Sequence, residues 1–208
     1  MRTLIVVAVD GEAEACQGLD AHIVVSGIGR TNAAAATTLA AVAHGPFEAV
    51  LSVGVAGALP GGNLSIGDVV GATACVYSEE GVVTPAGCQD VRALGLPLGD
   101  FEGNEVPCSP ALVRLISPVC PKARIATVAT CSGTDAAANA VAERTGCAAE
   151  AMEGAAVVHA ARRLSIPAIE IRSISNTTGE RESQQWDLKR ALRTLASTLP
   201  AVLSRLNA

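Results

Sequence analysis

Two stretches of the chain carry glutamates that could support acid–base chemistry on a polar ligand. Glu12 and Glu14 lie in "DGEAE", directly after the apolar run at 3–9, where a carboxylate could serve as a general base. Glu153 lies in the otherwise apolar "AMEGAAVVHAA", and a buried carboxylate is costly unless it is paired or binds a ligand. Either stretch could instead be an acidic helix start that the helix dipole stabilises.

Glycine-rich turns and hydroxyl groups follow three other apolar runs. Ser26 begins "SGIGRTNAAAA", Gly57 lies in "GVAGALPGG", and Ser132 lies in "CSGTDA". Backbone amides of such turns can hold a polar ligand, although Gly57 could mark a sharp turn and Ser132 or Thr134 could cap a helix. Asn32 replaces the third glycine of a dinucleotide fingerprint, which disfavours a dinucleotide-dependent oxidoreductase.

The stretch "EIRSISNTTGERESQQWDL" at 170–188 contains an apolar run that ends in Ser175 and Asn176, then a polar loop and the only tryptophan, Trp186. Asn176 could bind a ligand through its amide or could form a turn after a strand. Trp186 could contact an aromatic part of a ligand or could anchor the last helix. These residues are candidates for a binding site, with a structural alternative open for two of them.

The composition excludes several functional classes. The net charge is −5 and the 15 Lys and Arg residues are scattered, so no electrostatic footprint for nucleic acid or a membrane surface is present. The seven cysteines form no C-x-x-C pair and there are three histidines, which disfavours a metal site. The opening apolar run is too short for a signal peptide, and no run approaches the roughly 18–20 residues of a membrane span. We expect a cytoplasmic protein.

Short β-branched runs alternate with Ala-rich helical stretches along the chain. The expected strands cover 3–9, 22–26, 48–54, 68–76, 124–130 and 167–174, and the expected helices cover 11–18, 31–43, 109–116, 134–144, 151–164 and 184–206. This alternation predicts one α/β domain, 1–208, around a mostly parallel or mixed sheet. Residues 78–108 are rich in Gly, Pro and acids and are expected to form an irregular excursion. Ligands gather at the carboxyl ends of strands in such sheets, which is where the candidate residues fall.

Six stretches together resemble the nucleoside phosphorylase and nucleosidase superfamily over nearly the whole chain. They are "AVDGEAEA", "SGIGRTNAAAA", "SVGVAGALPGGNLSIGDVV", "CSGTDA", "AMEGAAVVHAA" and "IRSISN". The stretch "RSISNTTGERESQQWDL" is most similar to the futalosine hydrolase branch, which removes hypoxanthine from futalosine in menaquinone biosynthesis. The sister branch, the methylthioadenosine and S-adenosylhomocysteine nucleosidases, usually ends this strand in Ser-Asp.

The resemblance implies a three-layer αβα sandwich around a central mixed sheet, and hydrolysis of an N-glycosidic bond with no metal and no organic cofactor. Glu12 matches the water-activating carboxylate, with Glu14 in reserve. Met152 and Glu153 match the ribose clamp, where a carboxylate accepts hydrogen bonds from the sugar hydroxyls; Met152 could instead be core. The expected partner is a small-molecule nucleoside, without nucleic acid or membrane. Relatives usually form homodimers or larger homo-oligomers, and 78–108 is a candidate interface or lid.

Asn176 departs from the adenine-cleaving relatives, in which an acid at this position can protonate N7 of the base. An amide can donate to a carbonyl O6 and accept from a protonated N7, which suits a 6-oxopurine such as hypoxanthine. Trp186 could then contact the aromatic group on the 5′ side of futalosine. Arg172 or Arg181 could meet the carboxylate of that group. The other candidates for substrate contacts, Ser26, Gly57, Ser132 and Ser175, lie in the matching stretches.

Three alternative functions remain at this stage. A phosphorylase would need cations at the first loop, where this chain has carboxylates and only Arg30 nearby, so hydrolysis is favoured. A methylthioadenosine or S-adenosylhomocysteine nucleosidase is disfavoured by Asn176. A nucleoside-binding protein without catalysis would have no use for Glu12 as a base.

Overall fold

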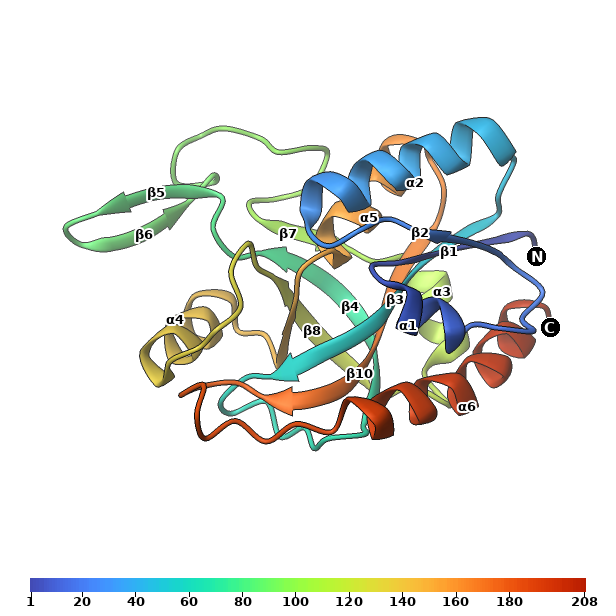
Figure 1. The fold of residues 1–208 in the computed structure, drawn as a ribbon. Helices are drawn as coiled ribbons and strands as arrows, with labels where there is room; N and C mark the ends of the chain where they lie inside the picture. The colour runs from blue at the N-terminus through green and yellow to red at the C-terminus, as the bar shows by residue number, and fades with distance from the viewer.

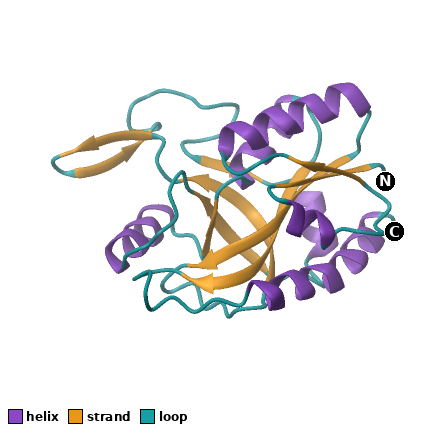
Figure 2. Cartoon of the chain, viewed as in Figure 1, coloured by secondary structure: helices purple, strands orange, loops and turns teal.

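The computed structural model describes residues 1–208 and has a central mixed sheet of eight strands, helices around it, and a separate two-stranded hairpin (Figure 1; Figure 2). The sheet strands are β1 (Thr3–Val7), β2 (His22–Val25), β3 (Ala49–Ala58), β4 (Val69–Tyr77), β7 (Glu105–Pro107), β8 (Lys122–Thr127), β9 (Ala149–Ala151) and β10 (Ala168–Thr177). The hairpin strands are β5 (Gly81–Thr84) and β6 (Gly87–Asp90). The helices are α1 (Asp10–Glu14), α2 (Arg30–His44), α3 (Pro110–Ile116), α4 (Asp135–Thr145), α5 (Gly154–Arg163) and α6 (Leu188–Leu206). The expected α/β fold around a mixed sheet is confirmed.

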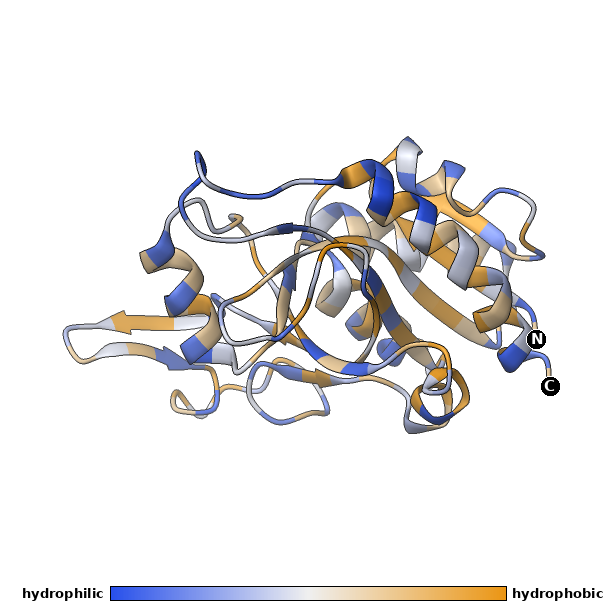
Figure 3. Ribbon diagram, turned by 90° about the horizontal axis from the view of Figure 1, so that it is seen from below, coloured by the Kyte–Doolittle hydropathy of each residue, from blue (hydrophilic) through white to orange (hydrophobic).

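Burial explains why the strands appear in the sequence as continuous apolar runs. All five residues of β1 and nine of the ten of β10 are buried, as expected for strands covered on both faces. The helices instead alternate between hydrophobic and hydrophilic residues along their length (Figure 3). In α6, Leu195, Leu199 and Val202 are among the buried residues, at helical spacing. None of the helices is both long enough and apolar enough to span a membrane.

One part of the sheet closes on itself. β3 pairs in parallel with β10, β10 pairs antiparallel with β4, and β4 pairs in parallel with β8. β8 pairs in parallel with β9, which returns antiparallel to β3 and completes a ring of five strands. β1 and β2 extend the sheet beyond β3 as parallel neighbours. The closure depends on β9, which has three residues and is too short to show a periodic pattern in the sequence.

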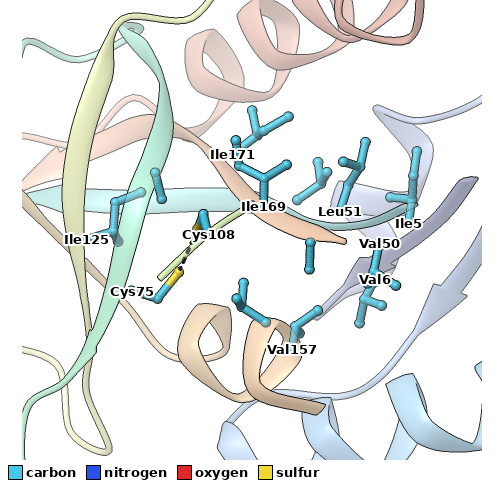
Figure 4. Packing of buried hydrophobic residues seen from close by; sticks show 14 of the residues in the cluster. Ile5, Val6, Val50, Leu51, Cys75, Cys108, Ile125, Val157, Ile169 and Ile171 are labelled. Carbon is cyan, nitrogen blue, oxygen red and sulfur yellow. Dashed lines mark hydrogen bonds between the residues drawn. The ribbon is translucent and has the colours of Figure 1, made fainter. Parts of the chain in front are cut away.

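An apolar cluster of 41 buried residues packs the sheet against α2, α3, α5 and α6, and a smaller cluster lies between the sheet and α4. Figure 4 shows Ile5 of β1 and Leu51 of β3 near Ile169 and Ile171 of β10, with Val157 of α5 in the same cluster. Burial of aliphatic side chains such as these contributes about 1.5–3 kcal/mol each to stability. The strands that carry the candidate site therefore pack on a well-ordered hydrophobic core.

Residues 78–108 differ from the sequence expectation. They contain β7 and the β5–β6 hairpin, which extends away from the body of the molecule (Figure 1), so the expected irregular excursion is correct only outside these three short strands. Most hairpin side chains are exposed. Their sequence therefore lacks the alternation of buried and exposed positions that marks a strand on a core.

Two helices begin later than expected, and both shifts affect the site. The helix expected at 151–164 begins at Gly154, so Glu153 is its N-cap residue and does not lie inside it. The helix expected at 184–206 begins at Leu188, because Asp187 caps it by accepting a hydrogen bond from the Arg190 amide (2.9 Å).

The carboxyl ends of three strands meet at one edge of the sheet. β1, β3 and β10 run parallel to one another, so their ends point in the same direction. A bulge in β10 between Ile174 and Asn176 pairs Asn176 with Gly57 of β3, and such bulges commonly redirect a side chain next to a site. α1 follows the end of β1 directly, which brings its acidic residues to the same edge.

Candidate active site

A fully buried arginine, Arg172 of β10, lies at the centre of the site and contacts three buried glutamates. Its Nε donates to Oε1 of Glu170 (2.8 Å) and its Nη2 donates to Oε2 of Glu153 (3.3 Å). Nη1 lies 3.9 Å from Oε1 of Glu12. We call these four residues the Arg172 group. A buried charge is tolerated only where it is paired and hydrogen-bonded, and here one cation holds three carboxylates together.

Glu12 is positioned from two sides by backbone amides. The amide of Ala8 donates to its Oε2 (2.8 Å), and the amide of Val55 on β3 donates to its Oε1 (2.9 Å). A side chain at Gly54 would overlap both Oε1 of Glu12 and Nη1 of Arg172, so a glycine is needed there for close approach. Glu14, the reserve candidate for the base, is exposed.

Glu153 reaches the same group from the start of α5. Its Oε1 accepts a hydrogen bond from the Gly29 amide (3.0 Å), in the glycine-rich turn before α2. Its Oε2 meets Arg172. As the N-cap residue of α5 it makes no side-chain cap bond, so its carboxylate serves contacts across the site. The alternative that it only stabilises a helix start is therefore not supported by its contacts.

Glu170 was not among the sequence candidates. It lies two positions from Arg172 on β10, so both side chains point to the same face of the strand. Burial raises the pKa of Glu170 above its usual value, against the lowering effect of Arg172. Burial alone would lower the pKa of Arg172, but Glu170, Glu153 and Glu12 outweigh it and raise that pKa. The alternation of Ile169, Glu170, Ile171 and Arg172 was a signal in the sequence that could have identified the pair.

The Asn176 amide lies next to Gly57 and is fixed by its neighbours. Ser175 Oγ donates to Asn176 Oδ1 (2.8 Å), and Asn176 Nδ2 donates to the Thr177 carbonyl (2.9 Å). A Cβ at Gly57 would lie 3.1 Å from Nδ2, so the glycine keeps the space beside the amide open. Gly57 is two positions from Val55 on β3, so the structure brings Asn176, Ser175 and Gly57 to the strand end that also holds Glu12.

Two other candidates, Ser26 and Ser132, use their polar groups locally, and Met152 packs against apolar side chains. The hydroxyl of Ser26 has two carbonyl acceptors for its one proton, those of Gly27 (2.8 Å) and Val7 (3.1 Å). Met152 is half-buried against the smaller apolar cluster near α4. Ser132 is buried, and its amide (2.7 Å) and hydroxyl (2.6 Å) both donate to Glu150.

Glu150 is a second buried carboxylate that sequence reasoning missed. Burial raises its pKa above the usual value, and the hydrogen bonds from Ser132 act against that shift. The helix cap in this segment is Thr134, whose hydroxyl accepts from the Ala137 amide (3.1 Å). The Glu150–Ser132 pair therefore fixes the loop before α4 and does not belong to the Arg172 group.

Trp186 lies on the loop at 178–187, which we call the rim loop. It pairs with Asn176 through a β-bridge, and half of the residue is exposed (51%). The sequence alternative that Trp186 anchors the last helix gains no support, because the residue precedes α6 and half of it is exposed. The Arg181 guanidinium lies over its ring (4.9 Å to the centroid), and Gln184 accepts from both Arg181 and the indole N–H (3.0 Å each).

Two arginines considered for anion binding are already engaged. Arg30 Nη1 lies 2.9 Å from Oε1 of Glu80 and 3.3 Å from Oε2 of Glu79, so this cation is neutralised by two carboxylates. Arg172 is enclosed within its group and cannot meet a substrate carboxylate. Arg181 is exposed and is the remaining candidate for that contact.

A cavity of about 1240 Å³ lies next to the β5–β6 hairpin, lined by segments of 76–107 together with residues of β8, α4 and α5. Its lining includes none of Glu12, Glu153 and Asn176. The cavity and the Arg172 group are therefore separate features. Within the residues of the chain, no cluster of three or more His, Cys, Asp and Glu side chains has an arrangement that could hold a metal ion.

Buried carboxylates at the carboxyl ends of parallel strands, beside a fixed amide, form a site for a polar small molecule. The family model for the phosphorylase superfamily matches residues 10–206, and the chain belongs to that superfamily.

Relatives of similar sequence show to which branch of the superfamily the chain belongs. The chain is 36% identical to a futalosine hydrolase of Thermus thermophilus, over 86% of this chain and 79% of that protein. It is 35% identical to a futalosine hydrolase of Acidothermus cellulolyticus, over 97% of this chain and 90% of that protein. A third relative from Streptomyces coelicolor, also a futalosine hydrolase, is 32% identical. Within the superfamily, the chain belongs with the futalosine hydrolases.

Solved structures confirm the fold. The futalosine hydrolase of Helicobacter pylori superposes with a TM-score of 0.80 at 20% identity, covering 98% of this chain and 97% of that one. The methylthioadenosine/S-adenosylhomocysteine nucleosidase of S. pneumoniae, solved with a transition-state inhibitor, gives a TM-score of 0.82 at 23% identity, over 99% and 100% of the two chains. Both branches share this architecture, so the fold alone does not separate them.

Proposed function

We propose that this chain hydrolyses the N-glycosidic bond of futalosine and releases hypoxanthine. The observation that carries the proposal is the placement of two buried carboxylates, Glu12 and Glu153, on one guanidinium at the ends of β1, β3 and β10. The three futalosine hydrolases at 32–36% identity support the choice of substrate.

The proposed base is Glu12. Each of its oxygens accepts one backbone N–H and retains a lone pair that can accept a proton from water. Hydrolysis of an N-glycosidic bond passes through a ribosyl cation with oxocarbenium character, so a water attacks the anomeric carbon as the purine departs. Glu12 would take the proton of that water, which is a step that typically contributes about 10²–10⁴-fold to the rate.

Glu153 is the proposed ribose clamp. Its carboxylate can accept hydrogen bonds from the 2′- and 3′-hydroxyls, and such bonds strengthen as positive charge develops on the sugar. Arg172 and the Gly29 amide hold this carboxylate in place. The clamp would therefore stabilise the transition state more than the bound substrate.

Asn176 is the proposed reader of the purine. Because the Thr177 carbonyl can only accept, the amide atom bonded to it is Nδ2, and Ser175 donates to Oδ1. One N–H of Nδ2 is bonded to the Thr177 carbonyl, and the other can donate to O6 of hypoxanthine while Oδ1 accepts from a protonated N7. An amino group at C6 would face that donor, which disfavours adenine by about 1–3 kcal/mol per unsatisfied group.

The 5′ side is assigned to the rim loop. Arg181 and Trp186 form an exposed pair of a cation and an aromatic face beside Asn176. Such a pair suits an aromatic group that carries a carboxylate. Ser26, Ser132 and Met152 are retained as substrate-binding candidates: Met152 offers an apolar contact, whereas the hydroxyls of Ser26 and Ser132 are engaged locally.

A substrate panel tests the proposed function. Purified protein is incubated with futalosine, inosine, methylthioadenosine and S-adenosylhomocysteine, with and without phosphate, and the released base is identified chromatographically. We expect hypoxanthine from futalosine at a rate that does not depend on phosphate. Strict phosphate dependence would identify a phosphorylase, and rapid adenine release with futalosine untouched would identify the sister nucleosidase.

We also propose that the chain folds as one domain in the cytoplasm and assembles as a homodimer or a larger homo-oligomer, with 78–108 at the interface or as a lid. The exposed Val82 and Val83 of the hairpin support this assignment. Sedimentation analysis of the wild type and of Val83→Asp tests it. A wild-type monomer at micromolar concentration would contradict it.

A further inference from the structure

The Arg172 group continues beyond its glutamates to a cysteine that has no part in the proposed chemistry. Glu170 Oε2 accepts from Cys75 Sγ (3.0 Å) on β4, and Cys75 lies 3.8 Å from the thiol of Cys108. Figure 4 shows these two cysteines among the apolar side chains of the core. All three residues are buried. Both oxygens of Glu170 are therefore used, one by Arg172 and one by Cys75.

The guanidinium geometry makes Glu170 the anchor of the group. The guanidinium is planar, so fixing Nε also fixes the directions of Nη1 and Nη2. The bond from Nε to Glu170 is the shortest that Arg172 makes (2.8 Å). The bonds from its two Nη atoms are longer, 3.2–3.3 Å, and reach Ser52 Oγ, Glu153 Oε2 and the Val55 carbonyl. A rotation away from Glu170 would move Nη2 from Glu153 and Nη1 from Glu12.

The start of α5 packs directly against the carboxylate of Glu170. A Cβ at Gly154, the first residue of α5, would overlap both carboxylate oxygens of Glu170. The glycine therefore lets the start of α5, and with it Glu153, approach this carboxylate closely. Buried ion pairs add little net stability, and apolar replacements of similar volume are often equally stable. A stability role alone is thus a weak reason for a charged residue at position 170.

We propose that Glu170 is a positioning residue of the reaction: it holds Arg172 in the orientation that aligns Glu153 and Glu12, and Cys75 holds Glu170 in turn. The inference rests on the proposed function, because it assigns Glu153 and Glu12 their roles. Neither Glu170 nor Cys75 touches the substrate in this assignment.

The first test compares Glu170→Leu with Glu170→Gln. Leucine removes the acceptor for Nε, and we expect kcat to fall about 10- to 100-fold per folded enzyme, with a smaller change in KM, because misplacement of an aligned group by about 1 Å can cost that much. Glutamine keeps an acceptor of the same shape and should recover most of kcat, because its bond from the Arg172 cation remains charge-assisted through the donor. The control is Thr37→Val, a buried hydroxyl in α2 that donates to the Ala33 carbonyl (2.7 Å).

The second test uses Cys75. Valine removes the donor to Glu170, whereas serine retains one. We expect Cys75→Val to lower kcat about two- to tenfold by loosening a supporting hydrogen bond, and Cys75→Ser to restore it. Loss of activity in both variants, in proportion to lost folded protein, would indicate packing and would overturn this role for Cys75.

The Nε–H proton of Arg172 gives a readout that does not depend on the substrate. In the wild type, this buried and bonded proton should exchange slowly with water and give a resolved NMR signal. The signal should disappear or shift in Glu170→Leu and persist in Thr37→Val. A wild type inactive on the whole substrate panel would overturn the proposed function. An unchanged Nε–H signal, or an active wild type with Glu170→Leu within twofold in kcat, would overturn the positioning role.

Discussion

The buried Arg172 group and the exposed rim loop lie at the same end of the sheet but are built in opposite ways. The Arg172 group draws its side chains from α1, the N-cap position of α5 and β10, and each carboxylate has at least two partners. The rim loop arranges Arg181, Gln184 and Trp186 against one another, and two hydrogen bonds tie it to the loop before α4: Gln184 Nε2 donates to the Ser132 carbonyl (2.9 Å) and the Arg181 amide donates to the Gly133 carbonyl (3.0 Å). The first region is buried and held by several elements, whereas the second is exposed and held by its own side chains and one neighbouring loop.

Under the proposed function, this difference separates the residues that carry the chemistry from those that select the substrate. Groups that move protons or stabilise a developing cation must be held within a fraction of an ångström, which the buried partners of the Arg172 group provide. Recognition of a variable 5′ substituent needs exposed, adaptable surface, which the rim loop provides. Substitutions in the first region should therefore change kcat, and those in the second should change KM for particular substrates.

The largest effect is expected for Glu12→Gln. The amide cannot accept the proton of the attacking water, so kcat on futalosine should fall about 10²–10⁴-fold. The NH2 group would also face the amide of Ala8 or Val55, which should lower the free energy of unfolding by about 1–3 kcal/mol. Single-turnover hypoxanthine release measures the first effect. Glu14→Gln, at the exposed neighbour, is the control, and unchanged turnover in Glu12→Gln would remove Glu12 as the base.

Asn176→Asp tests the boundary between the two regions. A carboxylate cannot donate to O6, so the ratio of kcat/KM for inosine over adenosine should fall about 10- to 100-fold, equivalent to one unsatisfied polar group. Parallel assays on the two nucleosides measure this ratio. Asn104→Asp, an amide outside the site that donates to the Tyr77 carbonyl (2.9 Å), serves as control. A ratio that stays constant would mean that Asn176 does not read the base.

Trp186→Ala should affect the rim alone. Loss of an exposed aromatic contact is worth about 0.5–1.5 kcal/mol, so KM for futalosine should rise roughly two- to tenfold while kcat and the KM for inosine stay the same. The midpoint of thermal unfolding should hardly change, because the side chain does not dock α6. Leu39→Ala, at an exposed position of α2 (70% exposed), is the control. An equal loss on both substrates would place Trp186 outside the 5′ side.

The smallest effect is expected at Glu150, a buried carboxylate outside the Arg172 group. Its pKa is raised in the folded state, so between the usual and the raised pKa the folded chain binds a proton that the unfolded chain has released. The free energy of unfolding therefore falls as pH rises through that window and stays lower above it. Glu150→Gln should flatten this dependence, because its carbonyl can accept from the Ser132 amide while its NH2 donates to the Ser132 hydroxyl.

Denaturant unfolding at several values between pH 4 and pH 8 measures the change at Glu150. Glu143→Gln, on the exposed face of α4, is the matched control and should leave the slope unaltered. If Glu150→Gln showed the same slope as the wild type, the buried carboxylate would not be a source of the pH dependence.

Sequence reasoning located Glu12 and Glu153 because each follows or precedes a regular element in a recognisable pattern. It selected neither Glu170 nor the role of Arg172, because both alternate with isoleucines inside an apolar strand and their partners lie far away in the sequence. Local pattern cannot show that one guanidinium is shared by three carboxylates. The pairing of β3 with both β1 and β10, together with the position of the start of α5, brings these residues together.

The fold was predictable to a similar degree. Runs of β-branched apolar residues, as in β1 and β10, identified these strands from the sequence alone. β9 and the β5–β6 hairpin were not predicted. β9 has only three residues and the hairpin is exposed, so neither shows a periodic pattern of apolar residues. Trp186 was misplaced for a different reason, since the position of the Asp187 cap decides where α6 begins.

The closed ring of strands also has a consequence for how the chain folds. Arg172 lies 117 residues along the chain from Val55, whose carbonyl it contacts, and the strands of the ring come from both halves of the sequence. Contacts of such long sequence separation slow folding, because distant segments must meet before the contacts form. During synthesis, the first half of the chain would emerge with Glu12 in place and no guanidinium beside it. The capacity for catalysis would therefore arise in a single late event, when β10 joins β3, with no partly active intermediate before it.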